Sequence, residues 1–161
     1  MIHWQNLSHL LTNHTEFIDH EKRNSLKILK LFLNPDFAYD EKKIYFGFSF
    51  SSIIQKNNYY SLKYLLTLLN SVFARKWFYT FGKQRGVGVD IGVEKLRLFP
   101  VKIATPESQQ IFVQLADIAI KANLFSGLKF NTVCAIIDAL IFQLYFPDHM
   151  QDRKIDILKI V

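Results

Sequence analysis

The leucine-rich run from residue 61 to residue 81, SLKYLLTLLNSVFARKWFYTF, constrains the fold more than any other feature of the chain. Its large apolar residues recur at steps of three and four, which predicts an α-helix with one apolar face over 61–80. Ser61 stands where a helix N-cap accepts a backbone hydrogen bond. Because an apolar face must be buried, this helix needs a sheet or other helices to pack against. The stripe consists of Leu62, Leu65, Leu66, Leu69, Val72, Phe73 and Trp77.

The next stretch, FGKQRGVGVDIGVEKLRLFPV (81–101), ends the helical pattern and holds four of the six glycines. β-Branched residues separated by glycines favour a loop followed by a strand over 86–93. A short helical turn at 94–98 is expected before Pro100.

Upstream of the leucine-rich run, the segment IYFGFSFSSII (44–54) alternates large and small side chains. This is the period of a strand with one buried face. The segment SLKILKLFLN (25–34) fits a short strand as well as a helix. Between them, NPDFAYDEKK (34–43) has the composition of a turn.

Downstream, apolar steps of three and four predict helices at 106–125 and 131–146, and Pro147 stops the second. Together with the upstream patterns, they predict an α+β fold in which three to four helices pack with a small, mainly antiparallel sheet. The sheet would draw its strands from about 25–55 and 86–93.

The length of 161 residues predicts one domain, 1–161. Within it, a recognition part at about 25–100 would hold the sheet and the first long helix. A C-terminal helical part would occupy about 105–146.

The composition is that of a folded protein of a reducing compartment. Half of the residues are hydrophobic, enough for a sizeable core. The single cysteine, Cys134, excludes an intrachain disulfide and lies in an apolar run, where a buried and inert thiol is expected. The N-terminus lacks the pattern of a signal peptide, and no apolar run is long enough to span a bilayer. These features predict a soluble, cytoplasmic protein.

Positive charge is concentrated in the middle of the chain. The net charge is +6, yet residues 42–102 contain eleven Lys and Arg against two acids, Asp90 and Glu94. Such a concentrated basic field attracts polyanions such as nucleic acids. The alternative is a basic, solvated surface with no partner.

Common catalytic motifs are incomplete in this sequence. In GVGVDIG (86–92) the third glycine of a dinucleotide fingerprint falls on Ile91, and Lys83 precedes Gln84 where a P-loop needs Ser or Thr. The histidines and the single cysteine lack metal-ligand spacing. Asp117 and Asp138 are expected on polar faces of helices instead of forming a catalytic pair. No catalytic, cofactor-binding or metal-binding residue is therefore expected.

The order of motifs over 61–101 carries a resemblance. The leucine-rich run contains Leu69-Asn70-Ser71 and then the aromatic pair Trp77-Phe78, before a basic glycine loop, a strand and the segment LRLFPV. QLADIAIKAN, IDALIFQLYF and FAYDEKKIYFGFSFSSII add to it, so that it covers about 37–146. The chain resembles the TaqI-like C-terminal specificity domain of adenine-specific DNA methyltransferases and type IIG restriction–modification enzymes. It departs from that pattern where Val87, Val89 and Ile91 replace the aromatic residue that often follows the glycines.

The resemblance implies a division of labour. An upstream domain of such enzymes binds S-adenosylmethionine and methylates adenine, while this module reads double-stranded DNA and places the target base. The chain would therefore have no enzyme activity alone, and it would be either the C-terminal part of a larger enzyme or a separate specificity subunit. Its partners would be double-stranded DNA and a methyltransferase catalytic domain. The alternative function is a protein–protein docking module of the same or another nucleic-acid enzyme.

Under this reading, the glycines let a backbone approach DNA, and the neighbouring cations contact phosphates and base edges. Lysines would mainly hold phosphates, while an arginine or Gln84 reads a base edge. The candidate DNA contacts are Arg75, Lys76, Lys83, Gln84, Arg85, Lys95 and Arg97.

Overall fold

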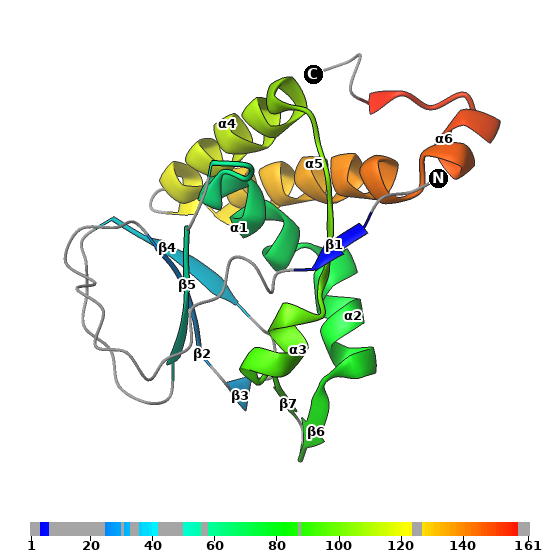
Figure 1. The fold of residues 1–161 in the computed structure, drawn as a ribbon. Helices are drawn as coiled ribbons and strands as arrows, with labels where there is room; N and C mark the ends of the chain where they lie inside the picture. The colour runs from blue at the N-terminus through cyan, green and yellow to red at the C-terminus, as the bar shows by residue number, and fades with distance from the viewer. Residues whose placement is uncertain are drawn as a thin grey trace.

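The computed structural model of the chain describes residues 4–6, 25–29, 31–32, 36–41, 50–55, 58–86, 88–123 and 127–157. Within these residues helices pack with small antiparallel sheets, so the α+β prediction is confirmed (Figure 1).

The described strands form three small sheets. In the first, β2 (Ser25–Leu29) is central and pairs antiparallel with β4 (Phe37–Asp40) and β5 (Phe50–Ile54). The second has the order β3 (Leu31–Phe32), β7 (Gly88–Asp90) and β6 (Lys83–Arg85). The third pairs β1 (Trp4–Asn6) with β8 (Pro100–Lys102).

These sheets settle the open assignments of the upstream segments. Residues 25–29 and 31–32 are strands, so the helical alternative for 25–34 is wrong. The turn predicted for 34–43 is also wrong where it is described, because Phe37–Asp40 pairs with β2 and Phe37 enters the core. Of the strand predicted at 44–54, residues 50–54 are strand and the rest lies outside the described residues.

The helix predicted over 61–80 is in fact two helices, α1 (Leu62–Asn70) and α2 (Val72–Phe81). Ser71 between them has an extended backbone with ψ of 158°. Its hydroxyl oxygen accepts a hydrogen bond from Ala74 N (3.1 Å) and its O–H donates to Leu68 O (2.6 Å). Ser71 thus caps the second helix, as Ser61 caps the first through Lys63 N (3.2 Å).

Asn70 ties this break to the first sheet. Its side chain accepts from Phe37 N (2.8 Å) and donates to Phe37 O (2.9 Å), so the amide mimics a pairing strand at the start of β4. The Leu-Asn-Ser motif therefore ends one helix, starts another and holds a strand edge.

The remaining helices follow in order. They are α3 (Val93–Arg97), α4 (Pro106–Asn123), α5 (Gly127–Tyr145) and α6 (Pro147–Asp152). The last one corrects the sequence prediction, because Pro147 ends α5 and also occupies the first turn of a further helix. Proline is suited to that position because its missing N–H has no partner there.

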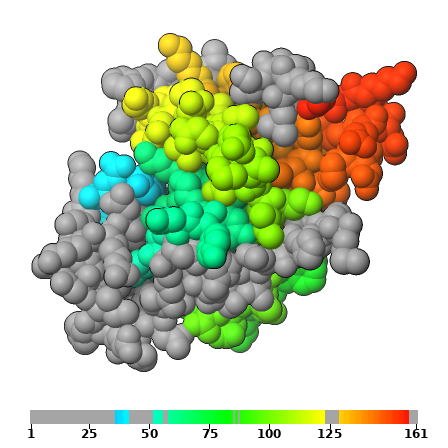
Figure 2. All heavy atoms as spheres, turned by 45° about the horizontal axis from the view of Figure 1, so that its top comes forward, coloured from blue at the N-terminus to red at the C-terminus, as the bar shows by residue number. Residues whose placement is uncertain are grey.

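One cluster of buried side chains runs from β4 through α1 and α2 to α5. Tyr64, Leu65 and Leu69 of α1 are fully buried, and α1 contacts both β4 and α4. In the same cluster, the ring of Phe78 in α2 stacks on the ring of Phe99, with the two ring centroids 5.3 Å apart. In Figure 2, α4 (yellow-green) lies against α1 (blue-green) and beside α5 (orange), in keeping with the contacts that α4 makes with both helices.

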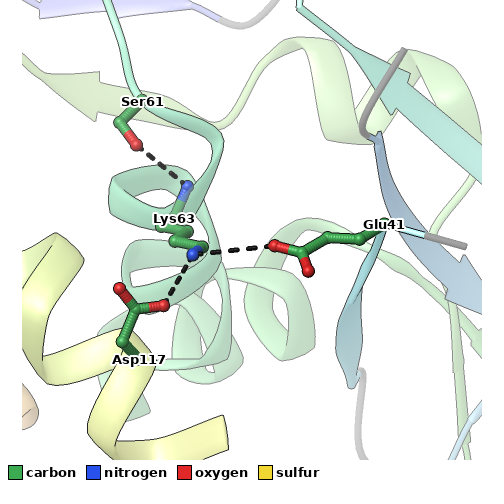
Figure 3. Close-up of polar contacts among 4 residues, drawn as sticks. All are labelled: Glu41, Ser61, Lys63 and Asp117. Atoms are coloured by element: carbon green, nitrogen blue, oxygen red, sulfur yellow. Dashed lines mark hydrogen bonds and ion pairs between the residues drawn. The ribbon is translucent and has the colours of Figure 1, made fainter. Parts of the chain in front are cut away.

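Charged and polar groups join α1 to its neighbours as well. Lys63 Nζ lies 2.6 Å from Asp117 Oδ1 of α4 and 3.7 Å from Glu41 Oε1 beyond β4 (Figure 3). The hydrogen bond to Asp117 is the main reason why the pKa of Lys63 is raised. Lys63, one of the cations counted in residues 42–102, therefore stabilises the fold through ion pairs.

We expect Asn70→Ala to lower the free energy of unfolding by about 2 kcal/mol or more, because it leaves the N–H and C=O of Phe37 without their partner. Urea denaturation followed by circular dichroism measures this. Gln110→Ala, which removes an exposed amide on α4, is the matched control and should be close to neutral. Equal losses for the two variants would show that the Asn70 amide contributes little.

Candidate nucleic-acid interface

Most of the candidate DNA contacts lie at the end of the molecule that is away from α4 and α5. There, α2 runs down to Phe81, the chain turns into the hairpin β6–β7, and α3 follows beside it (Figure 1). We call the hairpin Lys83–Asp90 together with α3 the basic end.

Gly82 fixes the hairpin to α2. A Cβ atom at this position would lie 2.3 Å from Val89 Cγ1 and 2.4 Å from the carbonyl oxygen of Phe78. Gly82 N also donates to Phe78 O (2.7 Å), which closes the last turn of α2. The close approach of helix and strand thus requires glycine here.

The turn between the two strands requires another glycine. Gly86 has φ of +59°, a left-handed backbone that disfavours other residues. Gly82 and Gly86 therefore have roles in packing and turning, while the expectation that glycines let a backbone approach DNA stays a prediction. Val89 and Ile91 are both 1% exposed and belong to the core, so they offer no stacking surface to a base.

Three of the predicted contacts lie on strand β6. Lys83 and Gln84 are exposed, and Arg85 takes the register position opposite Gly88. Gln84 Nε2 donates to Tyr79 O of α2 (2.8 Å), which links the strand back to the helix. Lys76 is exposed on α2 itself, one turn before the helix ends.

Two more predicted contacts lie on α3, and an acid accompanies them. Lys95 and Arg97 are partly exposed, and Arg97 Nη1 lies 3.2 Å from Glu94 Oε1. The Glu94 side chain of this pair is 83% exposed, so the ion pair itself is weak, while the Arg97 side chain is only 24% exposed. Asp90 stands opposite Lys83 in the strand register, so acids lower the positive charge of the basic end without cancelling it.

Arg75 is placed elsewhere. It is partly buried on α2, and its charge acts on Asp138 and Cys134 of α5. Asp138 Oδ1 accepts a hydrogen bond from Val72 N (2.8 Å), and burial raises the pKa of its carboxyl group in spite of that bond and of Arg75. The structure therefore places five of the seven candidates at the basic end and Lys76 exposed on α2, while Arg75, on the same helix, lies where α2 meets α5.

Asp138 and Asp117 were expected to be simple polar-face residues, but in the structure each binds a specific partner. Asp138 satisfies the first N–H group of α2, and Asp117 binds Lys63. Their partners lie 66 and 54 positions away in the sequence, and no local pattern reports them.

Within the part of the chain that is described, no three His, Cys, Asp or Glu residues lie together in a way that could hold a metal ion. Among the same residues, no helix is long and apolar enough to cross a membrane.

The fold and the candidate interface define the class of protein: it is a small α+β module with a basic strand hairpin at one end. The sequence model of the TaqI-like C-terminal specificity domain matches residues 4–101, more than half of the chain. The chain belongs to this family, which comprises DNA-recognition specificity domains of methyltransferases. A search among curated proteins gave no match. The matched residues include β1 to β7, α1 to α3 and the first two residues of β8. They end before α4, earlier than the resemblance of the C-terminal helices suggested.

Gly82→Ala should destabilise the chain by about 1–3 kcal/mol, because neither a backbone carbonyl nor the packed Val89 can move far enough to admit a methyl group. Gly92→Ala is the control, since a Cβ there meets nothing within 4 Å. Urea unfolding of both variants measures the difference. An unfolding free energy of Gly82→Ala close to that of Gly92→Ala would contradict the proposed attachment of the hairpin.

Proposed function

We propose that this chain is the sequence-specific reader of double-stranded DNA for an adenine-specific methyltransferase of a restriction–modification system, acting in the cytoplasm. The observation that carries the proposal is the exposed basic hairpin β6–β7 within a chain of the specificity-domain family. Type IIG enzymes, in which reader and writer share one polypeptide, are included in this proposal.

The hairpin has a suitable shape for the task. A two-stranded ribbon fits the major groove of B-DNA, which is about 12 Å wide. On this ribbon Lys83 and, beside it, Lys95 would hold phosphates and fix the register, while Arg85 at the tip would read a base edge. Lys76 on α2 would reach the flanking backbone.

Gln84 would distinguish bases through its side-chain amide. Its Nε2 is engaged with Tyr79 O, which leaves the Oε1 atom as an acceptor for an exocyclic amino group. In the major groove such groups are the N6 amino of adenine and the N4 amino of cytosine. The second hydrogen of Nε2 can in addition donate to a base acceptor, so Gln84 is suited to the paired donor and acceptor that adenine presents.

The rigidity of the hairpin supports this role. Val89 and Ile91 are anchored in the core, and Gly82 presses the hairpin against α2. A contact surface that is already ordered loses less entropy on binding than a loop that must first fold. Arg75, held against α5, would keep α2 in position and would not contact DNA.

S-Adenosylmethionine is assigned to the methyltransferase part and not to this chain. In the glycine-rich stretch 86–92, Gly86 lies in the turn of the hairpin and Gly88–Asp90 is its second strand, which leads into the five-residue helix α3. A nucleotide cradle needs a glycine turn between a strand and a long helix. Catalysis would therefore come from the partner, with this chain positioning the target.

The test is DNA binding by Lys83→Glu/Arg85→Glu, compared with Lys121→Glu on the exposed side of α4. Fluorescence anisotropy with mixed-sequence duplex DNA should show that the wild-type affinity falls as salt rises. The double variant should lose most of this binding and reduce the salt slope by about 1, since Lys83 is the one residue of the two that is assigned to a phosphate and each lost phosphate contact removes about one unit. Lys121→Glu should bind like the wild type.

Two results would contradict the proposal. One is wild-type binding that stays constant between low and high salt. The other is a Lys121→Glu variant that loses as much affinity as the double variant, which would place the DNA on the α4 face.

A further inference from the structure

An exposed aromatic ring, that of Phe81, stands where α2 ends and the hairpin begins (Figure 1). Its side chain is 52% exposed. Lys83 follows two residues later, so the backbones of the two residues lie within about 7 Å of each other. An apolar ring therefore borders the cations of the basic end.

Contacts with the core hold this ring in place. Its centroid lies 5.0 Å from that of Trp77, one helical turn earlier in α2. Trp77 in turn meets the rings of Phe78 and Phe99 edge-on, with centroids 5.2 Å and 5.5 Å away. Phe78 and Phe99 are fully buried, so a row of aromatic contacts runs from the core to Phe81. A ring that is already positioned loses little entropy when a ligand covers it.

The surroundings of the ring indicate the chemistry of that ligand. Lys83 and Gln84 are exposed on the next strand, and Lys95 and Arg97 of α3 are partly exposed. Cations beside an apolar ring suit a polyanion that also carries apolar groups. Double-stranded DNA meets both conditions, because its major groove displays the C5-methyl group of thymine between the phosphate backbones. This methyl group is accessible in paired DNA, whereas stacking on a base face would require the base to leave the duplex.

We propose that Phe81 contacts the methyl group of a thymine in the major groove and thereby selects an A·T base pair, an inference that rests on the function proposed above. The contact supplies affinity of a different kind from that of the cations, because burial of apolar surface releases no counterions. Phe81 and Gln84 favour the same type of base pair, since Gln84 suits adenine and the methyl group belongs to thymine.

The test uses a duplex selected by the wild-type chain from a random-sequence pool, and the same duplex with deoxyuridine in place of every thymine. Deoxyuridine pairs as thymine does and lacks the methyl group. In fluorescence anisotropy the wild-type chain should bind the deoxyuridine duplex about fourfold more weakly, the effect of burying about one methyl group. Phe81→Ala should lose at least this factor on the thymine duplex and should bind both duplexes alike.

Control variants distinguish a methyl contact from a general disturbance of the hairpin. Phe81→Leu keeps an apolar side chain and should retain part of the preference for thymine. Ile118→Ala on α4, where the side chain is 50% exposed, should distinguish the two duplexes as the wild type does. The salt slope of Phe81→Ala should equal that of the wild type, because no phosphate contact is lost.

The outcomes separate this inference from the proposed function. The inference is overturned, and the proposed function left standing, if the wild-type chain binds both duplexes equally or if the selected sites share no A·T pair. It is also overturned if Phe81→Ala still distinguishes the duplexes by the wild-type factor. Wild-type binding that is independent of salt, or selection that gives no common site, would contradict the proposed function and this inference with it.

Discussion

The architecture depends on the interruption between α1 and α2. Asn70 closes two hydrogen bonds onto the backbone of Phe37, and Ser71 ends the first helix and caps the second. Without this break, the leucine-rich run would continue as a single rod away from the sheet. With it, α1 remains buried between the sheet and α4, while α2 turns toward the end where the hairpin forms.

The second helix connects the basic end to α5. Its first N–H group is bound by Asp138 of α5, and its last turn is pressed against Val89 through Gly82. Aromatic packing of Trp77 and Phe78 with Phe99 fills the space between these two ends. The hairpin is in this way held at a constant separation from α5.

The sequence predicted the α+β class, the helical runs and the location of the basic residues, because each of these depends on local periodicity or on counted charge. The break at Ser71 was not predicted, because Val72 and Phe73 continue the apolar spacing of the helix. In addition, Phe37, which stabilises the break, is 33 positions from Asn70. The strand at 25–29 was ambiguous because only its pairing with distant strands excludes a helix. That Arg75 acts on Asp138 could not be predicted, because Asp138 comes from another helix far along the chain. The Asn-Ser pair, favoured at helix caps, was the one local signal of the break.

Amide hydrogen exchange of the module with and without a duplex containing the target site tests the central claim most directly, because it maps the bound surface without any substitution. The account predicts slower exchange on DNA binding in β6, β7 and α3, and unchanged exchange in the outer turns of α5. Protection that is confined to α4 and α5, with the hairpin unaffected, would contradict it.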